Sequence, residues 1–212
     1  MRSNACALLA VVLVGSTAFA EDINPPAWRG IAGSTYQNWD FLPNTPQGAP
    51  DAGVNNPYGS PIASAAPATY VAQMGARSGI WQLNSEDALQ FIVPALNVPA
   101  VTNSELWIQV TWFGPVPPLA FGYLGDNTTP LDFLGQSTLE LADGWHLTTY
   151  RLLAHEATPE FGLTIKNHLP NVSGSTMYVD QVVIDTMSII PAPGVGAMGL
   201  AGLIIAAGRR RR

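Results

Sequence analysis

The chain has almost no cysteine. Cys6 is the only one among 212 residues, so the chain beyond it can form no internal disulfide. The three histidines, His146, His155 and His168, are not spaced like zinc ligands. The fold must therefore be stabilised by a hydrophobic core.

Basic residues are scarce between the two ends. Residues 21–190 contain four of them, against all fifteen acidic residues, which gives this region a net charge of −11 although the whole chain carries −6. The four are Arg29, Arg77, Arg151 and Lys166. A region this acidic repels nucleic acid and anionic lipid, so nucleic acid is not expected as a partner, whereas divalent cations could be attracted.

Common catalytic signatures are absent as well. The chain has no Gly-x-Ser-x-Gly elbow and no glycine-rich phosphate loop. Glu156 and Glu160 could form the carboxylate pair that a glycosidase requires, but acidic residues are abundant enough for such a pair to arise by chance. We therefore expect a protein that is not an enzyme, with a secreted glycan-active enzyme as the alternative.

Helical periodicity is missing, and alternation with period two takes its place. Leu106, Ile108, Val110 and Trp112 fall on one face of an expected strand, and residues 160–166 alternate in the same way. Further strands are expected at 34–41, 69–74, 79–83, 87–93, 119–124, 144–153 and 178–184. Many short strands with turn signals between them predict an all-β domain over 21–188, a single jelly-roll-like β-sandwich, with a barrel as the alternative.

One stretch of this domain reads differently. Residues 42–67 contain six prolines and few core-sized side chains, which is typical of a long surface excursion between strands. We expect a plain covering loop there, with a functional loop as the alternative.

The N-terminus has the layout of a secretory signal peptide over residues 1–20. Arg2 gives the positive start, residues 5–15 are apolar, and Ala18 and Ala20 form the small-x-small cleavage pattern. We expect cleavage after Ala20 and export of the remainder.

The C-terminus, residues 189–212, has a different composition. Residues 195–208 are fourteen residues without charge, which as a helix would reach about 21 Å against a hydrocarbon core of about 30 Å. Starting at Ile189 lengthens the segment to twenty residues. The chain then ends in a basic cluster, which the positive-inside rule would place in the cytoplasm: Arg209, Arg210, Arg211 and Arg212.

This three-part tail resembles the PEP-CTERM sorting signal of bacterial exported proteins. Pro191 and Pro193 match the two prolines of that motif, whereas Ala192 stands where the glutamate usually lies. The resemblance implies export to the cell envelope, a single-pass transmembrane helix as an intermediate, and processing by an exosortase-type enzyme. It also implies a place at the cell surface or in the extracellular matrix, among extracellular polysaccharide. The alternative is a structural or adhesive protein held permanently by its single membrane span.

The body carries a weaker likeness. Residues 25–41, 143–152 and 177–186 look like parts of β-sandwich domains joined to such tails, and the last also resembles the closing strand of carbohydrate-binding jelly rolls. These patterns support the expected fold more than any ligand.

Aromatic residues near loops are candidates for sugar contact, because an aromatic plane stacks on the apolar face of a sugar ring. The candidates are Trp28, Trp39, Tyr58 and Trp81, with core packing as the alternative for each. Trp107, Trp112 and Trp145 lie in strong strand patterns and are expected in the core.

No cofactor is expected, apart from a structural calcium ion. Sandwiches of the kind that the body resembles often hold Ca²⁺ between an N-terminal loop and the last strand, and carboxylates are its preferred ligands. Asp180 with Asp22 or Asp40 would supply such a site. The alternative is an acidic surface that keeps the protein soluble.

Overall fold

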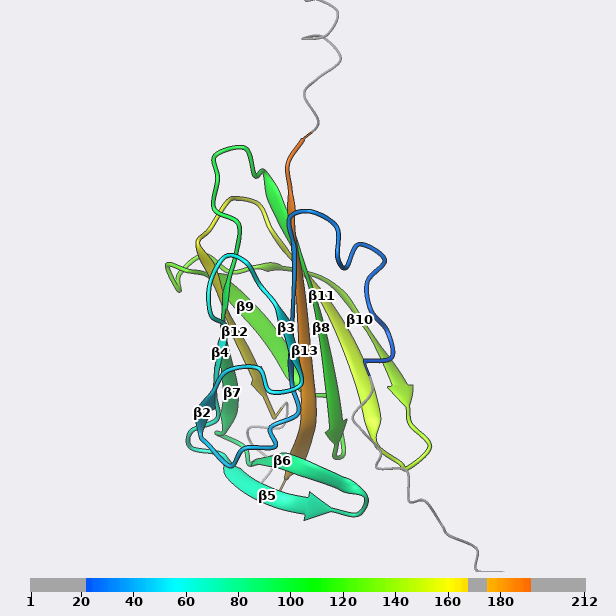
Figure 1. The fold of residues 1–212 in the computed structure, drawn as a ribbon. Helices are drawn as coiled ribbons and strands as arrows, with labels where there is room; N and C mark the ends of the chain where they lie inside the picture. Colours follow the sequence, from blue (N-terminus) through cyan, green and yellow to red (C-terminus); the bar gives the residue numbers. More distant parts are fainter. Residues whose placement is uncertain (1–21, 168–174, 192–212) are drawn as a thin grey trace, which may run out of the picture.

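The fold of this chain is all-β. The computed structural model describes residues 22–167 and 175–191, and all the regular elements in these two ranges are β-strands. They form two antiparallel sheets that pack as the layers of a β-sandwich (Figure 1). The expected fold class is thus confirmed at the level of an all-β, two-sheet architecture.

The larger sheet, sheet A, has a path of six strands with a hairpin added to it. Along the path lie β10 (Asp132–Glu140), β11 (His146–Ala154), β8 (Asn103–Phe113), β13 (Met177–Ile189), β1 (Ser34–Trp39) and β3 (Gly53–Asn55). The start of β13 also pairs with β6 (Arg77–Leu83), which forms a hairpin with β5 (Thr69–Met74).

The smaller sheet, sheet B, has five strands. In order they are β2 (Gln47–Gly48), β4 (Ile62–Ser64), β7 (Ala88–Pro94), β12 (Glu160–Lys166) and β9 (Leu119–Leu124).

The core lies between the two sheets, and the alternation along the strands puts it there. In β8, Leu106, Ile108, Val110 and Trp112 are all buried in one hydrophobic cluster, as expected from their spacing. Phe161, Leu163 and Ile165 of β12 meet them from sheet B. Burying apolar surface at roughly 25 cal/mol per Å² makes this layer the main stabilising element of a chain without disulfides.

The proline-rich residues 42–67 do more than cover the core. They contain β2, β3 and β4, and so supply edge strands to both sheets. The expectation of a plain covering loop is therefore wrong. Runs of two or three paired residues between prolines are too short to show any periodicity in the sequence.

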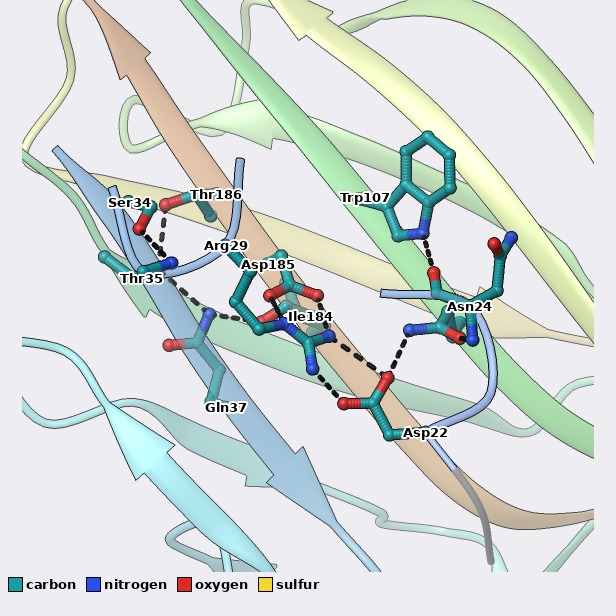
Figure 2. A network of polar contacts seen from close by, with 12 residues as sticks. Asp22, Asn24, Arg29, Ser34, Thr35, Gln37, Trp107, Ile184, Asp185 and Thr186 are labelled. Atoms are coloured by element: carbon teal, nitrogen blue, oxygen red, sulfur yellow. Dashed lines mark hydrogen bonds and ion pairs between the residues drawn. The ribbon is translucent and has the colours of Figure 1, made fainter. Parts of the chain in front are cut away.

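Residues 22–33, which we call the N-terminal strap, cross the outer face of sheet A (Figure 2). The guanidinium of Arg29 pairs with Asp22 within the strap and with Asp185 of β13, whose Oδ1 lies 2.6 Å from Nε. The backbone N–H of Asn24 donates to Gln109 of β8 at 3.0 Å. The strap thereby buries polar residues on a sheet face that would otherwise meet solvent.

Trp107 lies under this strap and not in the core, so that expectation is wrong. Its neighbours Leu106 and Ile108 point inward, so strand geometry turns Trp107 outward. There its indole N–H donates to the carbonyl of Asn24 at 2.8 Å. Trp112 and Trp145 are buried as expected.

The chain leaves sheet A through its central strand. β13 runs to Ile189, and Ile190 and Pro191 are exposed at the end of the sandwich (Figure 1). The expected signal peptide, with Ala18 and Ala20, and the tail from Ala192 through Pro193 to Arg212 lie outside the described residues. In the ranges 22–167 and 175–191 there is no helix with the length and hydropathy needed to span a bilayer.

Candidate functional site: an aromatic pocket

A largely apolar pocket of about 280 Å³ opens between the proline-rich residues 42–67 and the ends of β1 and β6. Small-molecule sites usually measure about 300–1,000 Å³ and combine apolar walls with a few polar groups, so this pocket lies just below the lower end of that range. Its lining residues are Trp39, Phe41, Pro43, Thr45, Pro46, Gly48, Ala49, Asp51, Ala63, Ser64, Ala65, Trp81 and Leu89.

Trp39 forms one wall because it is the last inward-facing residue of β1. It is 1% exposed, and its ring meets Phe91 edge-on with 5.0 Å between the centroids. Its indole N–H donates to the carbonyl of Gly48 at 3.3 Å, which ties the wall to β2. This contact fixes the ring orientation at the pocket.

Phe41 forms part of the same wall through an unusual backbone conformation. Its φ is +54°, a left-handed conformation that is costly for a bulky residue. The carboxylate of Asp51 stabilises this turn by accepting hydrogen bonds from the backbone N–H groups of Asp40 at 2.8 Å, Phe41 at 3.3 Å and Leu42 at 2.7 Å. Strained residues of this kind are concentrated at functional sites.

A close backbone approach supports the turn from the other side. Gly79 in β6 has φ +79°, and a Cβ at this position would lie 2.3 Å from the carbonyl oxygen of Asp40. Only glycine fits there, because it has no side chain and tolerates positive φ. The β5–β6 hairpin is thereby pressed against the strained turn at the pocket.

Trp81 of β6 completes the aromatic lining. It is 3% exposed, and Tyr70 of β5 packs on it edge-on at 5.3 Å. Thr45 and Ser64 supply hydroxyls and Asp51 a carboxylate to the lining, in addition to the indole N–H groups of Trp39 and Trp81. The lining has one carboxylate and no histidine, cysteine or lysine.

The structure brings together two of the four predicted sugar-contact residues, Trp39 and Trp81, at this pocket. Both are buried, so they form walls and not an open stacking platform. The other two lie elsewhere. Tyr58 is half-buried beside Gly33 and the end of β13, and Trp28 is half-buried in the N-terminal strap.

The predicted calcium site joins Asp180 to Asp22 or to Asp40. Asp40 lies within electrostatic range of Asp180, whereas Asp22 lies elsewhere, beside Arg29. Asp22 pairs with Arg29, Asp180 pairs with Arg77, and Asp40 accepts a hydrogen bond from Gln181 at 2.8 Å. Among residues 22–167 and 175–191, no three His, Cys, Asp or Glu side chains are placed to hold a metal ion. Arginine guanidinium groups supply the positive charge beside Asp22 and Asp180.

Arg77 is the centre of a second ion-pair cluster. It is 7% exposed, with its Nη1 2.5 Å from Asp180 and its Nε 2.7 Å from Asp143, and its guanidinium lies over the ring of Trp145 at 4.9 Å. Burial raises the pKa of Asp180 to about 6, because the loss of hydration outweighs the attraction of the guanidinium. Burial likewise raises the pKa of Asp185, beside Arg29, to about 6.

Sequence reasoning missed both arginine clusters and most of the pocket lining. One signal for the clusters was available: with only four basic residues among fifteen acidic ones, any buried aspartate needs one of those few cations as a partner. For Phe41, Asp51 and Ser64, which the fold gathers from different strands and loops, the sequence has no comparable signal.

The comparisons with known proteins give no further identification. No protein-family model matches the chain, and no curated protein is significantly similar to it.

Proposed function

We propose that this protein is an exported, non-enzymatic protein of the cell surface or extracellular matrix that binds extracellular polysaccharide through its aromatic pocket. The observation that carries the binding proposal is the meeting of Trp39 and Trp81, forty-two residues apart in sequence, at a single pocket. Aromatic walls take the apolar face of a sugar, and hydroxyl groups beside them bond its polar edge.

The size and chemistry of the pocket limit which ligands it can bind. About 280 Å³ with mostly apolar walls suits one sugar unit inserted end-on, and a methyl or acetyl substituent would fill the apolar part. Thr45 and Ser64 are the hydroxyl-bearing lining residues that would bond the hydroxyls of the sugar. The pocket therefore selects a chain end or a side branch, not the middle of a long polymer.

Export and sorting rest on the two ends of the sequence. The expected signal peptide and the PEP-CTERM-like tail imply transfer across the inner membrane, a membrane-held intermediate and an exosortase-type enzyme. The exposure of Ile190 and Pro191 directly after β13 supports this assignment, because a processing enzyme needs its motif clear of the folded domain.

We also propose that the sandwich is jelly-roll-like. The strand order supports it: the late strand β13 lies between β1 and β8 in sheet A, and the late strand β12 lies between β7 and β9 in sheet B. β10 departs from this pattern by extending sheet A beyond β11.

The binding proposal is tested on a panel of glycans with and without N-acetyl or deoxy groups, using tryptophan fluorescence and calorimetry. Trp81→Phe and Trp39→Phe should each weaken binding about two- to tenfold, because the smaller phenyl ring covers less of a sugar face and an aromatic contact contributes about 0.5–1.5 kcal/mol. Trp145→Phe, a buried tryptophan away from the pocket, is the matched control and should bind normally. Absence of binding to every glycan, or an equal loss in the control, would refute the assignment.

The sorting proposal is tested by mass spectrometry of the mature protein from a host that has the processing enzyme. Sorting predicts an N-terminus at Glu21 and loss of the residues after the Pro191 region. If the surface protein retains Arg212, it is permanently anchored and the sorting proposal fails, although the binding proposal is unaffected.

A further inference from the structure

The two sheets have edges of very different character. Sheet A ends on one side in β3, which has three residues, and sheet B ends in β2, which has two. The other edge of sheet B, β9, is covered by the chain that follows it, since Leu124 N–H donates to Thr129 and Leu131 N–H donates to Gly122, both at 2.9 Å. Short or covered edges are the usual protection against unwanted strand pairing.

β10 has neither protection. It is a nine-residue strand that, among residues 22–167 and 175–191, pairs with β11 alone and forms the outer edge of sheet A (Figure 1). It contains no proline and no lysine, and Phe133, Leu134 and Leu139 are 58%, 46% and 52% exposed. β5, the edge of the β5–β6 hairpin, is shorter, and its large apolar side chains are only half exposed or less.

The backbone groups of an unpaired strand edge determine what kind of partner can bind there. Alternating backbone N–H and C=O groups are satisfied by another extended strand, and by little else that also covers exposed apolar side chains. We propose that β10 is a self-association edge, where two copies of this chain pair antiparallel and join their sheets A into one continuous sheet.

Charge favours a second copy in one register. The acidic residues of β10, Asp132 and Glu140, lie at its two ends and leave 133–139 uncharged. If the two-fold axis passes through Thr138, Gln136 of one copy lies opposite Glu140 of the other, so an amide faces each carboxylate. If the axis instead passes through Gln136, Asp132 of one copy lies opposite Glu140 of the other, and two negative charges face each other. Cross-strand pairs of unlike character stabilise an antiparallel ladder, and like charges destabilise it. The bulge between Phe133 and Gly135 limits the regular pairing to residues 136–140, so Leu139 lies within the paired segment and Phe133 and Leu134 lie beyond it.

The topology fixes how such a dimer presents its ends. β10, β11, β8 and β13 alternate in direction, so antiparallel pairing of β10 makes the two β13 strands run in opposite directions. The two C-terminal ends then emerge at opposite ends of the dimer. Such a dimer is better suited to link two facing surfaces, with one copy attached to each, than to join two copies attached to the same surface.

The test compares two matched substitutions on opposite edges of sheet A. Leu139→Lys on β10 and Val54→Lys on β3 both replace an apolar side chain that is just over half exposed, 52% and 56%. Sedimentation velocity of the exported protein, in mild detergent if its tail is retained, should show a dimer for the unchanged chain and for Val54→Lys. Leu139→Lys should weaken dimerisation at least about tenfold, because each dimer would hold two edge lysines. Thermal unfolding confirms that both variants fold.

A covalent trap supplies the second measurement. In a Cys6→Ser background, which has no other cysteine, Thr138→Cys should form an intermolecular disulfide on mild oxidation, whereas Val54→Cys should not. Higher salt should strengthen the dimer by screening the repulsion between two acidic bodies. A monomer at all concentrations, equal effects of the two lysine variants, or cross-linking through residue 54 would overturn the proposal.

Discussion

Removing the guanidinium of Arg77 tests how the buried charges of this sandwich are balanced. Arg77 and Asp180 have side chains 8% and 4% exposed and 2.5 Å apart. Arg77→Met keeps much of the side-chain volume but leaves the carboxylate of Asp180 buried without its cation. Breaking one side of a buried pair typically costs about 3–5 kcal/mol. We expect a loss of unfolding free energy in this range at pH 7.5, measured by urea unfolding with tryptophan fluorescence.

The matched control is Arg151→Met. Arg151 also pairs with a carboxylate, Glu105, at 2.9 Å, but its side chain is 47% exposed. Exposed pairs contribute only about 0–1 kcal/mol, so this variant should remain close to the unchanged protein. The two substitutions are chemically identical, but the sites differ in burial and in the second carboxylate, Asp143, that Arg77 also pairs with.

Acid should rescue the Arg77 variant. The pKa of Asp180 is already raised to about 6 by burial, and loss of the guanidinium raises it further. At pH 5 the carboxyl group of the variant is therefore neutral, and the destabilisation relative to the unchanged protein should shrink. Equal losses for the two variants, or a loss that does not change between pH 7.5 and pH 5, would refute the reasoning.

Three further predictions follow from the same structure. Gly79→Ala should destabilise the protein by roughly 2–4 kcal/mol in urea unfolding, because its Cβ would meet the carbonyl of Asp40 at 2.3 Å. The free energy of unfolding should rise as the pH falls from 7 towards 4.5. The pKa values of Asp180 and Asp185 are raised from 3.8 to about 6 in the folded state, so protons bind the folded form more tightly than the unfolded form in that window. The gain is lost as the pH rises again through 6. Arg29→Met should release the N-terminal strap, and hydrogen exchange should then accelerate in residues 22–33 relative to β8.

Much of the sandwich could be predicted from the sequence because most strands have one buried face. The alternation in β8 and β12 reports that face directly, and both strands lie where it placed them. β10 was missed for the converse reason. Most of its residues are exposed on both faces, so no face is selected for apolar residues and no period of two appears.

The pocket was less accessible to sequence reasoning than the strands. Trp39 and Trp81 could be chosen as candidates by residue type, but their meeting depends on how β1, β6 and the proline-rich residues 42–67 pack at one end of the sandwich. The left-handed turn at Phe41 adds to the difficulty, since it is stabilised by Asp51, ten residues later in the chain. Long-range geometry of this kind has no local signature.

The position of β13 has a mechanical consequence. This strand runs between β1 and β8 and leads straight to the exposed Pro191, so a pull on the C-terminus is directed along the middle of sheet A. Backbone hydrogen bonds lie across the strand direction. A force along β13 therefore loads its hydrogen bonds to β1 and to β8 at the same time, in shear, instead of breaking them one after another. A tether attached there would transmit tension into the most extensively bonded strand of the domain.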